Sequence, residues 1–196
     1  MMIEPLTDQD TLPGAPLAPR LGPALKTWRL LRRMKQSHAA ELLGVSQATV
    51  SRWESGTQEP VGAQAERLAA LMAAHLDSDA DRALASLVRH SSDAVHLVCD
   101  TTHKLLAASP ARAAAWKVDV DELCGTSLWR FASAEIVAAE ARLGAARWFE
   151  PLAPAVELVT GANVSEIVPI RPSRMRWTRM RLADGSFARL VETLAA

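Results

Sequence analysis

The stretch Leu25–Pro60 restricts the fold more than any other part of the chain. Residues 39–43 (AAELL) favour a short helix, and Gly44 stands where a left-handed residue commonly ends one. Ser46 is then placed to cap a second helix through its hydroxyl. Two short helices joined by a tight turn, with a basic helix before them, predict a small helical unit that presents its last helix to a partner.

The two helices of this unit have distinct inner and outer faces. Val50 and Trp53 are three residues apart and therefore share one face of the second helix. The predicted inner set is Ala40, Leu43, Val45, Val50 and Trp53, so we expect Trp53 to lie in the core and not to stack on bases. The predicted outer set is Gln47, Ala48, Ser51 and Arg52. Small and polar outer residues favour a helix that enters the major groove of DNA.

Residues 21–75 resemble the XRE family, the Cro and phage-repressor type of helix-turn-helix protein. The resemblance rests on Gln36, on the run AELLGVSQATVSRWESG at positions 40–56 and on Pro60. It joins a turn, a cap, a core set and a spacing over about 35 residues, which makes it far more specific than one short motif. Ala39 departs from the pattern, because the family usually has a larger apolar residue there.

The resemblance implies base contacts for the outer residues. The helix at 46–55 would enter the major groove with its N-terminal end toward the base edges. Gln47 would pair with adenine, Arg52 with guanine, and Ala48 would contact a thymine methyl group. The alternative is that Gln47 and Arg52 are ordinary solvated residues.

The resemblance also implies residues that support the reading helix. Gln36 would hold a phosphate and brace Gln47, while Ser46 and Ser51 would bond to phosphate or water. Arg29 and Glu54 occupy positions that form an internal ion pair in this family, and a charge-assisted contact there would join the first helix to the reading helix.

The distribution of charge agrees with a DNA partner. The whole chain has a net charge of +0, but residues 20–76 carry eight Lys and Arg against four acids. Phosphate attraction requires positive charge where the DNA is read. A solvated basic face would have the same composition, so charge alone carries little weight.

The remainder of the chain divides into three parts around this unit. Residues 1–19 contain four prolines and no apolar periodicity, and we expect an arm without regular structure there. Residues 20–76 form the helix-turn-helix domain, with four to five helices. Residues 77–91 form a linker helix, with apolar residues along one side. Residues 92–196 form a second domain of different character.

The second domain is predicted to contain five strands and three helical segments. The strands are expected at 94–99, 104–108, 155–160, 164–182 (interrupted by Pro169 and Pro172) and 187–194. The helical segments are expected at 110–116, 121–124 and 134–149, the last one capped by Ser133. This order predicts an antiparallel sheet with its helices on one face, so the whole chain is of the α+β class.

Residues 92–194 resemble a PAS domain, a small sensor and dimerisation fold. The resemblance rests on AVHLVCD at 94–100, KLLAASPA at 104–111 and DELCG at 121–125, and Ser109 replaces the more usual Asn. It implies either a small-molecule ligand between the sheet and the helices or a domain that only makes dimer contacts. A flavin–cysteine adduct would need a cysteine shortly after Gly125, and residues 125–131 contain none.

Other chemistry is not indicated by the sequence. His96 and His103 could serve as axial haem ligands, but ordinary strand and turn histidines are expected instead. Cys99 and Cys124 are too few for a disulfide framework or a four-ligand zinc site, so two reduced thiols are expected. No arrangement of catalytic residues is legible, and we expect neither an enzyme nor a metal site.

A basic run lies in the predicted fourth strand, at Arg171, Arg174, Arg176, Arg179 and Arg181. We expect a solvated sheet face on which arginine stems cover apolar surface. The alternatives are a site for an anionic ligand or for a partner's acidic patch.

These observations predict a cytoplasmic, dimeric transcriptional regulator that reads a near-palindromic operator. No apolar run approaches the ~20 residues of a membrane span, and no signal peptide is evident at the N-terminus. The linker helix and the PAS-like domain are the expected dimer surfaces. The alternative function is a protein-interaction module, such as an antitoxin-like partner binder with secondary DNA binding.

Overall fold

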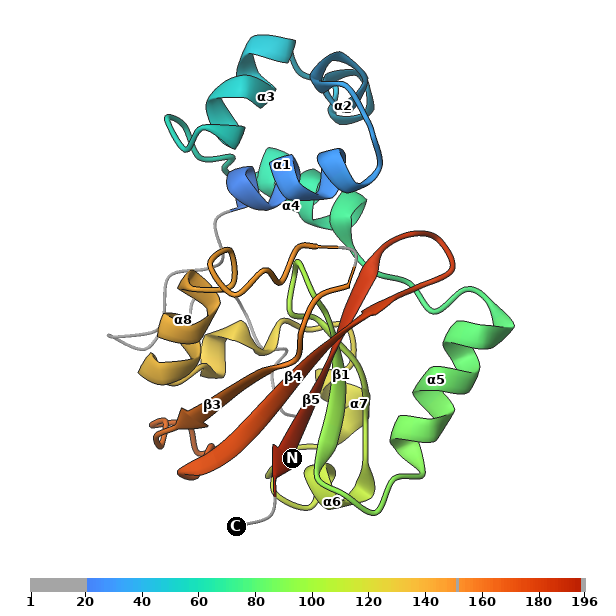
Figure 1. Cartoon of the computed structure of the whole chain (residues 1–196), viewed down its shortest axis with the longest axis vertical. Helices are drawn as coiled ribbons and strands as arrows, with labels where there is room; N and C mark the ends of the chain where they lie inside the picture. Colours follow the sequence, from blue (N-terminus) through green and yellow to red (C-terminus); the bar gives the residue numbers. More distant parts are fainter. Residues whose placement is uncertain (1–20, 151, 195–196) are drawn as a thin grey trace, which may run out of the picture.

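The computed structural model describes residues 21–150 and 152–194, and it stacks a helical domain on a sheet domain (Figure 1). The predicted arm at residues 1–19 lies outside the described residues. The helical domain contains α1 (Leu21–Leu31), α2 (Gln36–Leu43), α3 (Gln47–Glu54) and α4 (Ala63–Met72). These helices pack around a buried cluster that includes Leu25, Trp28, Leu43, Val50 and Trp53.

Local sequence signals set the ends of α2 and α3. Gly44 adopts a left-handed conformation with φ 67° and ψ 35°, which ends α2. The Ser46 hydroxyl accepts a hydrogen bond from the Thr49 backbone N–H at 3.1 Å and so caps α3. Gly22 permits α1 and α3 to touch, because a Cβ there would lie 2.0 Å from the Trp53 carbonyl oxygen.

The sheet domain is a single five-stranded antiparallel sheet with the strand order β2-β1-β5-β4-β3. Its strands are β1 (Val95–Cys99), β2 (Leu105–Ala108), β3 (Val156–Thr160), β4 (Ser173–Arg181) and β5 (Phe187–Leu194). The long central pair, β4 and β5, joins the two halves of the sheet. The predicted order of strands and helices, and with it the α+β class, is confirmed.

The helices between β2 and β3 pack against one face of this sheet. They are α6 (Pro110–Ala113), α7 (Val120–Leu123), the 3-10 helix η1 (Leu128–Phe131) and α8 (Ala134–Ala141). The cluster on this face includes Val98, Trp116, Phe131, Trp177 and Val191. Helices on one face of an antiparallel sheet are the PAS-like arrangement that the sequence predicts.

The opposite face of the sheet is covered by α5 (Asp79–Arg89), the predicted linker helix. Ser78 and Asp81 form a reciprocal capping box at its start. Ala85 and Val88 of this helix pack against Leu97 and Ala188 of the sheet. The helix therefore belongs to the core of the sheet domain in addition to linking the domains (Figure 1).

Several predicted elements are shorter in the structure, and the helix expected at 110–116 ends at Ala113. The helix expected at 134–149 ends at Ala141, because the chain then turns to bury Leu143 and Trp148. The strand expected at 164–182 begins only at Ser173. Before it, the Asn163 side chain donates to the Val168 carbonyl and accepts from the Ile170 N–H, which holds the segment as a loop. Pro169 and Pro172 in this loop also lack the backbone N–H that hydrogen bonding to a neighbouring strand requires.

Direct contacts join the two domains. The Arg32 guanidinium, after α1, lies 4.0 Å from the Asp184 carboxylate in the β4–β5 turn. The Cys99 thiol of β1 accepts a hydrogen bond from the Ala74 N–H at 3.3 Å, just after α4.

Within residues 21–150 and 152–194, no helix is both long and apolar enough to cross a bilayer.

Candidate nucleic-acid interface

The outer face of α3 is free of contacts with the protein core. Gln47, Ala48, Ser51 and Arg52 are all exposed, while Val50 and Trp53 on the other side are fully buried. The burial of Trp53 agrees with the prediction that it is a core residue. The four residues predicted to read DNA therefore lie together on one accessible helix face.

Hydroxyl groups organise the start of this face. Ser46 Oγ and Thr49 Oγ1 are 2.8 Å apart, and Arg52 Nη2 lies 3.4 Å from the same Thr49 hydroxyl. The Arg52 side chain is thus drawn toward the N-terminal half of α3, where a helix in the major groove meets base edges. Among residues 21–150 and 152–194, no carboxylate forms an ion pair with Arg52, so none of these acids competes with another acceptor for its guanidinium.

A buried ion pair attaches α3 to α1. Arg29 Nε and Nη2 donate to the two carboxylate oxygens of Glu54 at 2.7 and 2.8 Å, a bidentate geometry. The Glu54 side chain is only 4% exposed and the Arg29 side chain 11%. Arg29 Nη1 also donates to the Met34 carbonyl at 2.7 Å, which ties the pair to the α1–α2 loop. The structure brings together the two residues whose pairing the sequence predicts.

The pKa of Glu54 reflects this environment. Burial raises the pKa of the carboxyl group, but the hydrogen bonds from Arg29 and Gln36 and the charge of Arg29 outweigh it, so the pKa lies below its ordinary value. The same bond raises the pKa of Arg29. Both groups are therefore charged near neutral pH, and the pair holds α3 at a fixed angle to α1.

The Gln36 side chain contacts the buried ion pair in the free protein. Its amide nitrogen donates to Glu54 Oε2 at 2.9 Å. No hydrogen bond joins it to Gln47 among the residues that the structure describes. Because Glu54 is a stronger acceptor than a neutral amide, Gln36 donates to the carboxylate and joins the ion pair that connects α1 to α3. Its predicted contacts with phosphate and Gln47 stay a prediction.

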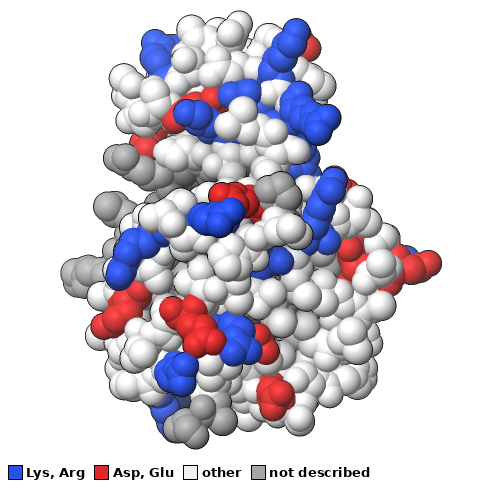
Figure 2. All heavy atoms as spheres, in the orientation of Figure 1, with Lys and Arg blue, Asp and Glu red and all other residues white. Residues whose placement is uncertain are grey.

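Charge on the surface follows the division into domains. Figure 2 shows Lys and Arg spread over the visible face of the helical domain, with few acidic groups among them. The visible face of the sheet domain carries acidic and basic groups side by side. The helical domain is thus the more electropositive of the two on this face, which suits phosphate contacts.

The basic run of β4 divides between the two faces of the sheet. Arg174 and Arg176 lie outside and form ion pairs with Glu157 of β3 at 2.9 and 2.8 Å. Arg179 lies inside, where its Nε donates to the buried Asp100 carboxylate at 2.9 Å. The predicted solvated face is therefore correct for the first two residues and wrong for Arg179, because the Asp100 carboxylate, directly after β1, neutralises it.

The remaining candidate ligands do not assemble into a metal centre. Within the described ranges, no three His, Cys, Asp or Glu side chains come together in a way that could hold a metal ion. Cys99 and Cys124 are both free thiols. His103 Nε2 lies 3.5 Å from the Glu140 carboxylate, and His96 stacks edge-on against Trp116.

Comparison with known proteins agrees with the geometry of the helical domain. The family model described as "Helix-turn-helix" matches residues 25–77, the segment that contains α2, the Gly44 turn and α3. Residues 25–77 are a helix-turn-helix domain. This domain is of the XRE type. The match supports the interpretation of the protein as a DNA-binding regulator. No curated protein matches the chain.

Two solved structures are similar to the chain. One is the PAS domain of an HTR-like protein from Haloarcula marismortui, at 17% identity and a TM-score of 0.42, covering 59% of this chain and 91% of that one. The other is an RNA-binding light-oxygen-voltage receptor, at 11% identity and a TM-score of 0.42, covering 89% of this chain and 58% of that one. At these values neither similarity bears on function.

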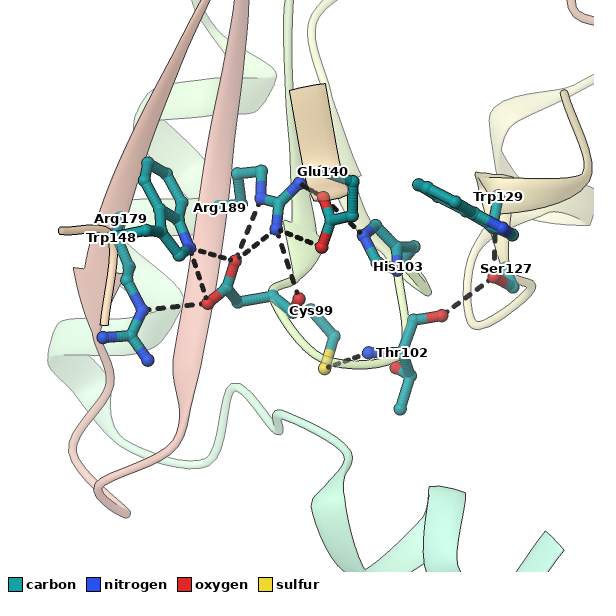
Figure 3. A network of polar contacts seen from close by, with 10 residues as sticks. Cys99, Thr102, His103, Ser127, Trp129, Glu140, Trp148, Arg179 and Arg189 are labelled. Atoms are coloured by element: carbon teal, nitrogen blue, oxygen red, sulfur yellow. Dashed lines mark hydrogen bonds and ion pairs between the residues drawn. The ribbon is translucent and has the colours of Figure 1, made fainter. Parts of the chain in front are cut away.

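Sequence reasoning missed two features of the sheet domain. One is the buried network around Asp100, whose carboxylate accepts hydrogen bonds from Trp148, Arg179 and Arg189. Arg189 also donates to the Glu140 carboxylate, a contact drawn in Figure 3, and so joins the two acids. The other is the buried Arg112 in the wall of the cavity between the sheet and the helices, because the alternative of a ligand there named no residue to hold it. These residues lie far apart in the sequence, so only a strongly polar residue inside an apolar strand, such as Arg189, could have signalled them.

Proposed function

We propose that this protein is a cytoplasmic transcriptional regulator that recognises a specific DNA sequence through α3. The exposed face of α3 carries the proposal: Gln47, Ala48, Ser51 and Arg52 are accessible on a helix that a bidentate ion pair holds in place. Gln47 would pair with adenine and Arg52 with guanine, and each such pairing is worth ~1–3 kcal/mol of discrimination. Ser46 and Ser51 would contact phosphate or water at the edge of the groove.

We further propose that the protein binds as a homodimer to a near-palindromic operator. A single module of this size buries too little surface for tight specific binding. Two copies of α3 would then lie about one helical turn of DNA apart. The sheet domain would supply the dimer contacts, and the outer side of α5 is a candidate because Leu87 is 73% exposed there.

The sheet domain would also pass a signal to the helical domain. Two features support this role. The Arg32–Asp184 contact and the Cys99–Ala74 hydrogen bond connect the sheet to α1 and to the end of α4. A shift of the β4–β5 turn or of β1 would therefore alter how the helical domain is held, and with it the spacing of the two reading helices.

The test is selection of bound fragments from a random DNA pool by the full chain at fixed salt. It is repeated with Gln47→Ala/Arg52→Ala and with the matched control Gln64→Ala/Arg67→Ala, which changes the same residue types at exposed positions of α4. We expect a near-palindromic site that the first double variant loses and the control keeps.

An equal enrichment by the Gln47→Ala/Arg52→Ala variant would contradict recognition through this face of α3. If no site is enriched and one protein partner co-purifies in stoichiometric amount, the antitoxin-like alternative is favoured over a DNA-reading role.

A further inference from the structure

A cavity of about 500 Å³ lies between the inner face of the sheet and the helices that cover it. Its walls are formed by β1, β4 and β5 on one side and by α6, η1 and α8 on the other. Large apolar side chains dominate them: Trp116, Trp129, Phe131, Ile136, Met175 and Trp177. A volume and lining of this kind are typical of sites for small organic molecules.

The cavity wall contains a buried arginine that no acid of the described residues neutralises. Arg112 of α6 is only 9% exposed. Its Nη2 donates to the Ala94 carbonyl at 2.7 Å and to Thr193 Oγ1 at 2.6 Å, while its Nε is buried without a hydrogen-bond partner. No carboxylate of a described residue forms an ion pair with it. Burial accordingly lowers its pKa to about 10.

His96, which belongs to β1, lies beside Arg112. Its Nδ1 is buried and makes no hydrogen bond within the described part of the chain. Burial, and then the charge of Arg112, lower the pKa of His96 well below its ordinary value. The ring is therefore neutral near pH 7 and can offer one N–H donor to an acceptor in the cavity.

Of the two other arginines that line the cavity, Arg171 lies exposed in the loop before β4, and Arg189 is already neutralised. Arg189 of β5 donates to the Asp100 carboxylate at 2.8 and 2.9 Å and to the Glu140 carboxylate at 2.6 Å. Figure 3 shows its guanidinium enclosed by these contacts. An added anion would meet two carboxylates there. Of the two buried arginines, Arg112 is therefore the one that can accept an anion from the cavity.

We propose that the cavity binds an apolar carboxylic acid, with its carboxylate on Arg112 and its hydrocarbon or aromatic body among the tryptophans. Leaving a buried guanidinium without an anion is costly, and a ligand carboxylate removes that cost through charge-assisted hydrogen bonds. His96 would supply a further donor. This inference rests on the proposed function, since it names the class of signal that the sheet domain receives.

The test measures binding to the full chain without DNA, by calorimetry. The probes are naphthylacetate and decanoate, each compared with its neutral amide. A charge-assisted bond to Arg112 should make at least one acid bind about tenfold or more tightly than its amide. Equal affinity of acid and amide, or no binding by any of the four probes, would overturn the proposal.

Variants locate the carboxylate. Arg112→Met should abolish the preference for the acid, and Arg112→Lys should restore part of it, because a single charged donor remains. Arg89→Met, an exposed arginine at the end of α5, is the control and should leave both affinities unchanged. If Arg112→Met does not fold, Arg112→Lys decides the matter: undiminished acid affinity and preference there would contradict the guanidinium contact.

The outcome is separable from that of the DNA selection. Acid binding without an enriched DNA site would refute the proposed regulator and leave the ligand class standing. An enriched DNA site without any preference for acids would refute the ligand class and leave the proposed regulator standing.

Discussion

Replacement of Glu54 by alanine tests how the ion pair with Arg29 anchors α3, the proposed DNA-reading helix, on α1. The Glu54 carboxylate accepts two hydrogen bonds from Arg29 and one from Gln36, all between 2.7 and 2.9 Å. Without it, the Arg29 side chain, 11% exposed, keeps the Met34 carbonyl as its single hydrogen-bond partner among the residues that the structure describes. Removing one member of a buried pair costs about 3–5 kcal/mol. The partial exposure of Arg29 places the expected cost near the lower end, about 3 kcal/mol.

The assay is thermal unfolding of the full chain followed by helical circular dichroism. For a domain of this size, 1 kcal/mol corresponds to roughly 4–8 °C in Tm, so the helical domain of Glu54→Ala should melt roughly 12–24 °C lower. Glu66→Ala, an exposed acid on α4, is the matched control and should shift Tm by very little. DNA affinity should fall as well, since α3 loses its anchor on α1.

A Glu54→Ala variant that melts together with the control would refute this reasoning. A second variant separates lost charge balance from lost packing. Arg29→Met/Glu54→Leu replaces both charges by apolar groups, and it should recover most of the lost stability, because apolar replacements of a buried pair are often neutral or stabilising. Failure of the double variant to recover stability would show that the hydrogen bonds to Met34 and Gln36 matter more than the charges.

Three further predictions follow from other contacts. Gly22→Ala should destabilise the helical domain by about 1–3 kcal/mol in chemical denaturation, because its Cβ would meet the Trp53 carbonyl at 2.0 Å; wild-type stability would contradict the close approach. Burial raises the pKa of Glu140, but the contacts with Arg189 and His103 lower it by a larger amount, so the pKa falls from an ordinary 4.5 to about 2. The ionised Glu140 carboxylate should therefore contribute its full stabilisation above about pH 4.5 and lose it as the pH falls toward 2. In Glu140→Gln, the free energy of unfolding measured with urea should depend less on pH in that window. Leu87→Asp should shift a dimer toward monomer in sedimentation experiments, whereas the exposed Val164→Asp should not; an unchanged dimer would place the interface elsewhere.

The helical domain could be predicted almost entirely from the sequence, because its signals are local. A left-handed glycine, a capping serine and apolar residues three or four apart act within one or two helical turns. Gly44, Ser46, Val50 and Trp53 lie where those rules place them. The roles of Gln47 and Arg52 toward DNA remain predictions, since they depend on a partner.

Contacts in the sheet domain that join distant residues were decided by the tertiary structure alone. The sequence determined the order of strands and helices, because alternation and turn residues are also local. It could not show that α5 covers the sheet, that Trp148 ends the α8 segment by turning to Asp100, or that Arg179 is neutralised by a residue 79 positions away. The unpaired Arg112 emerged in the same way. Whether a buried charge has a partner depends on which distant side chains the fold brings beside it, and no local pattern carries that information.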